Sequence, residues 1–176
     1  MTTTTNWKKH LAAIVCAALF AFTAQAQKFA YVDTNKILEG VGDYRKAQDE
    51  LDKLATKWRQ DIAQEYDKIK GMYSRYQAEQ VLLSDDVKKI REEEIMNKEK
   101  EVREMQKDKF GAEGALFKKR QELVRPIQDR VYGVIESYAA EKGYDFILDR
   151  SDAAVGIIYS NPTYDKTSDI LKRVGK

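Results

Sequence analysis

The sequence predicts an α+β fold in which a long antiparallel coiled-coil hairpin of two helices projects from a small β-containing body. Three observations support this fold class. Charged residues make up 34% of the 176 residues, well above the roughly 25% of an average globular chain. The chain contains only two prolines, and apolar residues recur at helical spacing through its middle. Short apolar segments bounded by turn residues lie at both ends, and they predict the strands of the body.

The first 26 residues have the three parts of a secretory signal peptide. Lys8 and Lys9 give a positive start, residues 11–22 form an uncharged apolar run, and residues 24–26 read Ala-Gln-Ala, a typical cleavage site. A membrane-spanning helix needs about 20 apolar residues, and this run is shorter. We therefore expect cleavage at this site, export of the remaining chain through the inner membrane, and no stable membrane insertion.

Loss of this segment changes the chemistry available to the chain. It removes Lys8 and Lys9 but no acidic residue, so 31 basic residues become 29 and equal the 29 acidic residues. It also removes Cys16 and His10, the only cysteine and the only histidine. The exported chain then has no disulfide, no Cys–His or Ser–His catalysis and no histidine metal site. We expect no enzyme activity, no metal and no cofactor. A neutral chain also lacks the basic surface that nucleic-acid binding requires.

Residues 42–126 are expected to form the hairpin arm. The apolar residues of its first helix, and of the short segment before it, recur at steps of mainly three and four, as in a coiled-coil seam. They are Ile37, Val41, Tyr44, Ala47, Leu51, Leu54, Trp58, Ile62, Tyr66, Ile69, Tyr73 and Tyr76. The run from Leu54 through Trp58 and Ile62 to Tyr66 uses steps of four, which predicts a stutter in the seam. At 1.5 Å per residue, about 40 residues give an arm of roughly 60 Å.

The apolar pattern breaks at residues 79–85, which we expect at the tip of the hairpin. Ser84 is expected to cap a second helix that returns to the body. Pro126 either kinks this returning helix or begins a new one where the arm meets the body. Gly111 and Gly114 lie inside the returning helix and are either flexing points or tolerated surface glycines.

Residues 27–41 and 127–176 are expected to form the body. Its strands are predicted at residues 29–33, 144–148 and 155–159, because each is a short apolar run bounded by turn residues. The first and last parts of the chain must therefore meet at the base of the hairpin.

The body is small, and its apolar residues are the candidates for an oligomer interface. They are Phe29, Tyr31, Val32, Tyr144, Phe146, Ile147, Leu148, Ile157, Ile158 and Tyr159. A last helix is predicted over residues 168–173, with Thr167 as its cap. About 60 residues is near the size at which an isolated core is marginal, so we expect oligomerisation to complete the body.

Motifs at both ends of the exported chain match the pattern of one known family. At the start these are residues 29–33 (Phe-Ala-Tyr-Val-Asp), Ile37-Leu38, Tyr44, Ala47, Glu50 and Leu51. Toward the end they are Pro126-Ile127, Ala139, residues 142–144 (Lys-Gly-Tyr), residues 147–149 (Ile-Leu-Asp), Ile158-Tyr159 and residues 169–171 (Asp-Ile-Leu). With this order, these lengths and the signal peptide, the chain resembles the Skp/OmpH family of periplasmic chaperones over its whole exported length.

The resemblance implies a homotrimer in the periplasm, with strands from three subunits in a central body and three helical hairpins around a cavity. It also implies an ATP-independent holdase that binds unfolded outer-membrane proteins in this cavity and prevents their aggregation. Well-known members have strongly basic arms that attract acidic clients and lipopolysaccharide. The neutral exported chain departs from that pattern, so lipopolysaccharide binding is not carried over.

Flexible arms with aromatic and aliphatic side chains would supply the many weak contacts that a holdase needs, and Met suits promiscuous surfaces. The candidate client-facing residues are Trp58, Ile62, Tyr66, Ile69, Met72, Tyr73, Tyr76 and Met105. The alternative is that these residues form the hairpin's own seam, because apolar stripes of this kind usually pack in a core.

A second function also fits the sequence. An exported coiled coil can serve as a structural or adaptor protein of the cell envelope that binds one folded partner. A holdase should bind several unrelated unfolded chains, whereas an adaptor should ignore them.

Overall fold

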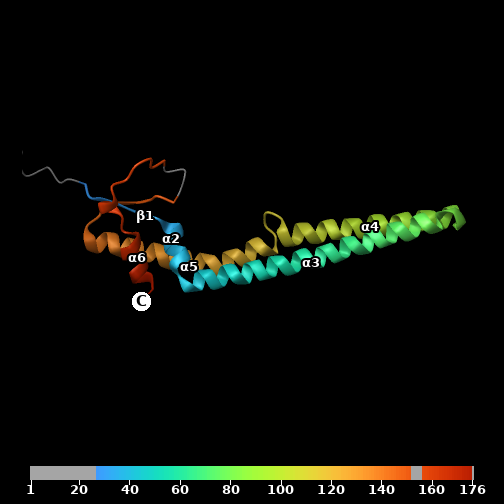
Figure 1. Cartoon of the computed structure of the whole chain (residues 1–176), viewed down its shortest axis with the longest axis horizontal. Helices are drawn as coiled ribbons and strands as arrows, with labels where there is room; N and C mark the ends of the chain where they lie inside the picture. The colour runs from blue at the N-terminus through green and yellow to red at the C-terminus, as the bar shows by residue number, and fades with distance from the viewer. Residues whose placement is uncertain (1–26, 152–155, 176) are drawn as a thin grey trace, which may run out of the picture.

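The computed structural model describes residues 27–151 and 156–175, so the predicted signal peptide and Val155 lie outside the described residues. The elements, in chain order, are β1 (Phe29–Val32), α2 (Thr34–Gly40), α3 (Gly42–Glu79), η1 (Gln80–Leu82), α4 (Asp85–Phe110), α5 (Ala115–Lys142), β2 (Phe146–Asp149), η3 (Pro162–Tyr164) and α6 (Thr167–Val174). Figure 1 shows a small body at one end and a long two-helix arm that extends from it. The described chain is therefore mostly helical, with one small sheet.

The sheet joins the two ends of the described chain. β1 and β2 pair in parallel, with Phe29 opposite Phe146 in the register. Because side chains alternate between the two faces of a strand, Val32 and Ile147 pack into the core of the body, whereas Phe29 and Phe146 point the other way. The two phenyl rings stack with their centres 5.3 Å apart.

Two local sequence signals set the ends of helices in the body. Asp33 caps α2, because its carboxylate accepts a hydrogen bond of 3.0 Å from the backbone N–H of Lys36. Gly143 ends α5 with a φ of 64°, a left-handed conformation that favours glycine. The backbone N–H of Tyr144 then donates to the carbonyl of Ala139 at 2.9 Å. Both ends are therefore set by residues that lie at the helix end itself.

The core of the body lies where three helices meet. They are α2, which follows β1, α5, which precedes β2, and α6, the last helix. Ile37 of α2, Val131 of α5 and Ile170 of α6 are 0%, 1% and 0% exposed. The other buried members of this cluster are Val32, Leu38, Val41 and Tyr138. Burial of each such aliphatic side chain stabilises the fold by about 1.5–3 kcal/mol, so this cluster anchors the base of the arm.

A buried hydrogen-bond cluster fastens β2 to the start of α2. The Thr34 hydroxyl and backbone N–H both donate to the Asp149 carboxylate, the latter at 3.3 Å. The Ser151 backbone N–H and hydroxyl donate to the same carboxylate at 2.9 and 2.8 Å. Partial burial raises the pKa of Asp149, but these hydrogen bonds outweigh it, and the net effect lowers the pKa.

The arm is built on one long helix and two shorter ones. α3 has 38 residues, which corresponds to about 57 Å at 1.5 Å per residue. Its first part packs on α5 through a cluster of Ala47, Leu51 and Val124. Its second part packs on α4 through a cluster of Ile62, Ile69, Ile95 and Val102. Figure 1 shows α4 and α5 following one another along the same side of α3.

The returning helix of the arm is interrupted, although the sequence predicts one continuous helix there. α4 ends at Phe110 and α5 begins at Ala115, with Gly111 and Gly114 in the turn between them. An added Cβ at Gly111 would lie 2.4 Å from the carbonyl oxygen of Lys107, and one at Gly114 would lie 2.9 Å from a backbone oxygen. These contacts are too short for a side chain, so the two glycines are neither surface replacements for alanine nor part of a helix.

Pro126 lies inside α5, which continues to Lys142. The proline therefore does not begin a new helix, and the second of the two predicted roles is wrong. A helix-interior proline removes one backbone hydrogen bond, and the surrounding helix persists because Val124, Ile127 and Val131 pack on both sides of it.

Three other expectations are corrected by the structure. Residues 156–160 form no strand: Gly156, at the start of this segment, has a φ of 64°, outside the extended range of a strand, and the outer edge of β1 is met instead by a bridge between Tyr31 and Asp165. Ser84 precedes α4 without a side-chain capping hydrogen bond. Thr167 is the first residue of α6 rather than its cap, and its hydroxyl accepts a 3.0 Å hydrogen bond from the Asp33 backbone N–H.

Candidate functional site

The seam of the arm follows a regular heptad rather than the predicted stutter. Along α3 the buried and half-buried positions alternate at steps of four and three: Leu51, Ala55, Trp58, Ile62, Glu65, Ile69, Met72 and Tyr76. Tyr66 lies beside this seam and not in it, because Glu65 occupies the inward position at that turn. On α4 the matching positions are Ile95, Lys98, Val102 and Met105. The pattern is that of a coiled-coil interface.

An ion pair lies in the middle of this seam. The Lys98 ammonium is 2.9 Å from the Glu65 carboxylate, and the two side chains are 31% and 17% exposed. Lys68 lies 2.6 Å from the other Glu65 oxygen. Hydrogen bonds from Lys68 and then from Lys98 lower the pKa of Glu65, and hydrogen bonds to Glu65 and then to Glu101 raise the pKa of Lys98. Both groups are therefore charged at neutral pH.

Tyrosine hydroxyls of α3 donate to polar side chains of α4 along the exposed edge of the seam. The Tyr66 hydroxyl donates to Gln106 at 3.4 Å, and the Tyr73 hydroxyl donates to Glu99 at 3.0 Å. The Tyr76 hydroxyl donates to Glu92 in the same way. Bonding to a carboxylate raises the pKa of both Tyr73 and Tyr76. The tyrosines thus bridge the two helices through their hydroxyls.

Trp58 marks the place where the arm changes from α5 to α4. Its ring meets the Phe110 ring edge to face, with centres 6.1 Å apart, and the Lys109 ammonium lies 4.8 Å from the centre of the Trp58 ring. A shallow groove begins beside it and is lined by Arg59, Ile62, Tyr66, Gln106 and Phe110.

The structure divides the eight candidate client-facing residues into two groups. Ile62 and Ile69 are 7% and 5% exposed in the seam, and Trp58, Met72, Tyr76 and Met105 are half-buried. Tyr66 and Tyr73 are 43% and 42% exposed. Of the eight candidates, therefore, only Tyr66 and Tyr73 have side chains that are well exposed to a bound chain.

Several exposed apolar residues were missing from that prediction. Val81 and Leu82, in η1, are 84% and 85% exposed, and Figure 1 shows that η1 lies at the far end of the arm. Ile90 and Met96 on α4 are 54% and 56% exposed. One feature of the sequence could have indicated that Val81 and Leu82 are exposed. The apolar pattern breaks at residues 79–85, which places both residues outside any seam.

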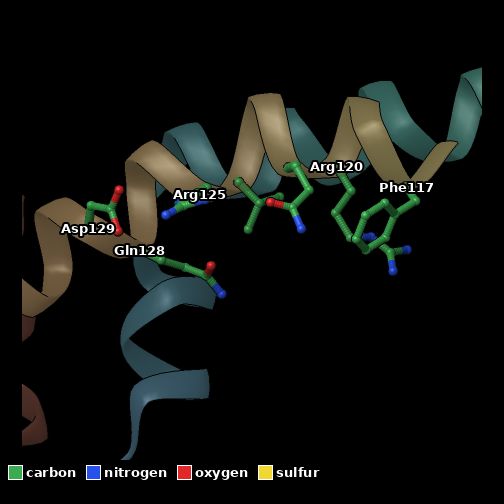
Figure 2. A pocket seen from close by; sticks show the side chains of 7 residues that line it. Phe117, Arg120, Arg125, Gln128 and Asp129 are labelled. Atoms are coloured by element: carbon green, nitrogen blue, oxygen red, sulfur yellow. The ribbon is translucent and has the colours of Figure 1, made fainter. Parts of the chain in front are cut away.

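The base of the arm carries a separate shallow pocket on α5 alone. Its lining residues are Phe117, Arg120, Gln121, Val124, Arg125, Gln128 and Asp129. Figure 2 shows the labelled side chains projecting from this one helix. A depression formed by neighbouring side chains of one helix offers no opposing wall that could enclose a small molecule, so it does not form a site for a small substrate.

The outer face of the sheet is apolar and partly uncovered. Phe29, Phe146 and Leu148 are 43%, 49% and 41% exposed. Beyond the sheet, Ile158 and Tyr159 are 101% and 82% exposed. By contrast, Ile157 is half-buried, and Tyr31 is 5% exposed. The predicted body residues thus differ in burial within the single chain: Tyr31 and, in part, Ile157 are covered, whereas the other residues named here are open.

Residues 27–151 and 156–175 contain no group of three or more His, Cys, Asp or Glu side chains placed to hold a metal ion. Among the same residues, no helix is both long and apolar enough to cross a membrane.

Comparison with known proteins gives a consistent assignment. Residues 28–174 match the profile of the family described as "Outer membrane protein (OmpH-like)". An uncharacterized protein of Aquifex aeolicus is 29% identical over 169 residues, with 96% of this chain and 97% of the relative covered. The chaperone protein Skp of Yersinia enterocolitica is 25% identical over 174 residues, covering 95% and 99%.

The fold has a counterpart among solved structures. A crystal structure of an OmpH-like outer membrane chaperone from Caulobacter crescentus superposes with a TM-score of 0.68 over 85% of each chain, at 9% sequence identity. That likeness concerns the fold, whereas the profile match covers nearly the whole described sequence. The chain therefore belongs to the OmpH-like family, the family of Skp, as the resemblance of its terminal motifs predicted.

Proposed function

We propose that the chain is an ATP-independent periplasmic holdase that binds unfolded outer-membrane proteins between helical arms and keeps them from aggregating. The observation that carries this proposal is the arm itself. An arm of about 57 Å built on the 38 residues of α3 extends away from the body, and Tyr66, Tyr73, Val81 and Leu82 are exposed along it. Membership of the OmpH-like family supports the same reading.

The proposed assembly is a homotrimer formed through the body. Its interface would include the open face of the sheet, where Phe29, Phe146 and Leu148 are each more than 40% exposed. Burial of apolar surface favours association, and the part of this free energy that exceeds the cost of ordering the subunits stabilises the assembly. Ile158 and Tyr159 lie outside the single-chain core, and we propose that they add to this interface.

Client binding in this proposal rests on many weak apolar contacts rather than on net charge. The exported form, residues 27–176, is neutral, so it lacks the basic arm that would attract lipopolysaccharide or an acidic client from a distance. The aromatic and methionine side chains of the arm can adapt to different apolar segments. Export itself would follow from cleavage of the signal peptide at residue 26.

The direct test is suppression of aggregation. Residues 27–176 are mixed with a urea-unfolded outer-membrane β-barrel, turbidity is followed after dilution, and mass is measured by multi-angle light scattering. The expected result is a trimer that suppresses turbidity at near-stoichiometric concentration. A monomer that does not suppress turbidity contradicts both the assembly and the holdase, and binding to one folded envelope protein alone supports the adaptor alternative.

The exposed tyrosines can be tested with a matched control. Tyr66→Ser with Tyr73→Ser removes two aromatic rings from the arm and is expected to weaken client holding while the trimer mass is unchanged. Tyr132→Ser with Tyr164→Ser removes two rings that are each 54% exposed on α5 and η3 and should hold clients as before. Equal holding by both double variants excludes the two arm tyrosines as client contacts.

A further inference from the structure

α4 is separated from the rest of the fold at both of its ends. It begins after the η1 turn and ends at the turn of Gly111 and Gly114. At that second turn a side chain on either glycine would clash with backbone oxygens, so the turn as it stands requires glycine, and it separates α4 from α5. Motion of α4 therefore need not pass through a rigid helix into the body.

α4 is held on α3 by one apolar cluster and by polar cross-links. Of the 26 residues of α4, Ile95 and Val102 are the buried ones, and they share a cluster with Ile62 and Ile69 of α3. Half-buried side chains of both helices pack around this cluster, and Phe110 of α4 meets Trp58 of α3. The hydroxyls of Tyr66, Tyr73 and Tyr76 add exposed hydrogen bonds. Exposed polar contacts add little net stability because water competes for the same groups.

The Glu65–Lys98 pair weakens the distal seam further. It stands at an inward heptad position between the Ile62–Val102 and Ile69–Ile95 contacts, with its charges 2.9 Å apart. Two charges lose hydration when they are buried in a seam, and this loss costs free energy. Replacing a desolvated ion pair by packed apolar residues removes that cost and is therefore often stabilising. When the helices separate, water solvates both charges again, so the pair favours the open state relative to an apolar pair.

The proximal arm has a second support. α5 packs on α3 through Leu51 and Val124, which are 2% and 6% exposed, and it is also tied to the body through Val131 and Tyr138, which are 1% and 5% exposed. Its cross-helix ion pair is less desolvated, because Glu50 is 55% exposed and lies 3.5 Å from Lys119.

The buried residues of α4, by contrast, lie only in the cluster that α4 shares with α3. A region with fewer buried anchors opens at lower free energy than its neighbours, so α4 with the distal half of α3 is the part of the chain expected to open first.

We propose that α4 is a strap that detaches from α3, and that the freed seam is the main binding surface for unfolded polypeptide. The surface would present Ile62, Ile69 and Met72 of α3 together with Ile95, Val102 and Met105 of α4. This inference rests on the proposed holdase function and assigns its binding site. It explains how residues that are covered in the closed hairpin can serve a client.

The chemistry of the seam fits extended apolar segments. The apolar side chains are separated by Glu65 and Lys98, which would be solvated in the open state and keep the arm soluble. A segment with alternating apolar and polar residues, as in a membrane β-strand, can place its apolar side chains on the two isoleucine clusters. The charged layer between the clusters can accept the polar groups of the segment.

The test replaces the polar layer. Glu65→Leu with Lys98→Leu, made in residues 27–176, is expected to slow amide hydrogen exchange in α4 and distal α3 by about tenfold or more, which is the lower part of the range for such replacements. If the client binds the open arm, a tenfold smaller open fraction weakens its apparent affinity about tenfold. Affinity is measured with a labelled unfolded β-barrel.

A matched control separates opening from added hydrophobicity. Lys100→Leu with Glu104→Leu replaces an ion pair of 4.0 Å on the solvent side of α4, where the side chains are 71% and 64% exposed. This variant adds the same two leucines and should leave exchange unchanged and client affinity undiminished. Weaker binding by the control and by the seam variant alike overturns the proposal.

A second measurement follows the strap directly. Ser74→Cys on α3 and Asn97→Cys on α4 are exposed positions, and residues 27–176 contain no other cysteine. Spin labels on this variant, diluted with unlabelled protein, should show a longer distance population after the client is added. An unchanged distance overturns the strap whatever the seam variant does.

The outcomes also separate this inference from the proposed function. If the wild-type chain does not suppress aggregation, the holdase function is wrong. If it suppresses aggregation, and the seam variant exchanges more slowly yet binds the client equally well, the function stands and the seam is not the site.

Discussion

The phenol of Tyr138 gives a prediction that can be worked from the contacts of the body. The residue is 5% exposed, and its hydroxyl donates to the Asp169 carboxylate of α6 at 3.0 Å. Its ring stacks on Tyr144 with centres 6.0 Å apart, and the Arg173 guanidinium lies 4.7 Å from the ring centre. Burial and then the bond to Asp169 raise the pKa of Tyr138 to about 12.

Tyr138→Phe keeps the ring contacts and removes the hydroxyl. At neutral pH the loss of one hydrogen bond should cost about 1 kcal/mol of unfolding free energy, because the exposed Asp169 carboxylate can bind water instead. The alkaline response carries more information. Since the pKa of Tyr138 is higher in the folded chain than the ordinary value of 10.0, its contribution is complete below pH 10 and is lost as the pH rises toward 12.

The size of that loss follows from the two pKa values. A pKa of about 12 against an ordinary 10.0 corresponds to at most about 3 kcal/mol. The wild-type chain should therefore lose this stability between pH 10 and 12, whereas the Phe variant loses less. Above about pH 11 the variant should equal or exceed the wild type.

Guanidinium unfolding at fixed protein concentration and at pH 7, 9, 10.5 and 11.5 measures both effects. Tyr73 and Tyr76 also titrate late, but they are present in both proteins and cancel in the difference. Tyr132→Phe, at a residue that is 54% exposed, serves as the control and should follow the wild type at every pH. Parallel stability curves for wild type and Tyr138→Phe would refute the assignment of this alkaline loss to Tyr138.

Three further predictions concern the body and its junction with the arm. Ile170→Ala, at a residue that is 0% exposed, should lower the unfolding free energy by about 2–5 kcal/mol in guanidinium titrations, with the helical circular dichroism retained before the transition. Pro126→Ala should raise the melting temperature, because a helix-interior proline costs about 3 kcal/mol relative to alanine, and a lower melting temperature would mean that the proline shapes a contact the body needs. Asp149→Asn should cost about 1–3 kcal/mol at neutral pH; because the folded-state pKa is lowered, this stabilisation is present above about pH 4 and lost as the pH falls, so the wild type and the variant should converge in acid titrations.

The parts of the fold that sequence could predict are those set by local chemistry. Asp33 precedes a helix and can reach only the nearby free N–H groups, so its role as a cap follows from its position. Gly143 takes the left-handed conformation that ends a helix. The terminal strands were predictable as apolar runs, although their parallel pairing depends on contacts between residues more than 100 positions apart.

The seam shows where sequence reasoning stops. Both Glu65 and Tyr66 lie at helical spacing from Ile62, and hydrophobicity favours the tyrosine as the inward residue. The structure places Glu65 inward because Lys98 of α4 supplies the opposite charge at 2.9 Å. Only the register between two helices reveals this pairing, and a single helix pattern carries no register.

The third predicted strand did not form. Residues 156–159 are apolar enough for a strand, but Gly156 has a φ of 64°, outside the extended range, and the segment pairs with neither strand of the sheet. The outer edge of β1 carries the Tyr31–Asp165 bridge and a 2.9 Å hydrogen bond from the Lys166 N–H to the Tyr31 carbonyl. The apolar side chains of Ile158 and Tyr159 remain exposed in the single chain.

Stability and polarity are distributed in opposite directions along the molecule. The body holds most of the fully buried side chains, among them Ile37, Val131 and Ile170, whereas the distal seam places the half-buried charges of Glu65 and Lys98 between its buried aliphatic residues. An arm with a wholly apolar seam would be firmer, but its seam would stay closed and would invite aggregation whenever it opened. The Glu65–Lys98 layer lowers the stability of the distal seam. The Gly111–Gly114 turn separates α4 from α5, so this loss need not extend to the body. The same residues that make the distal arm weak are thus the ones that would let it open in water and close again.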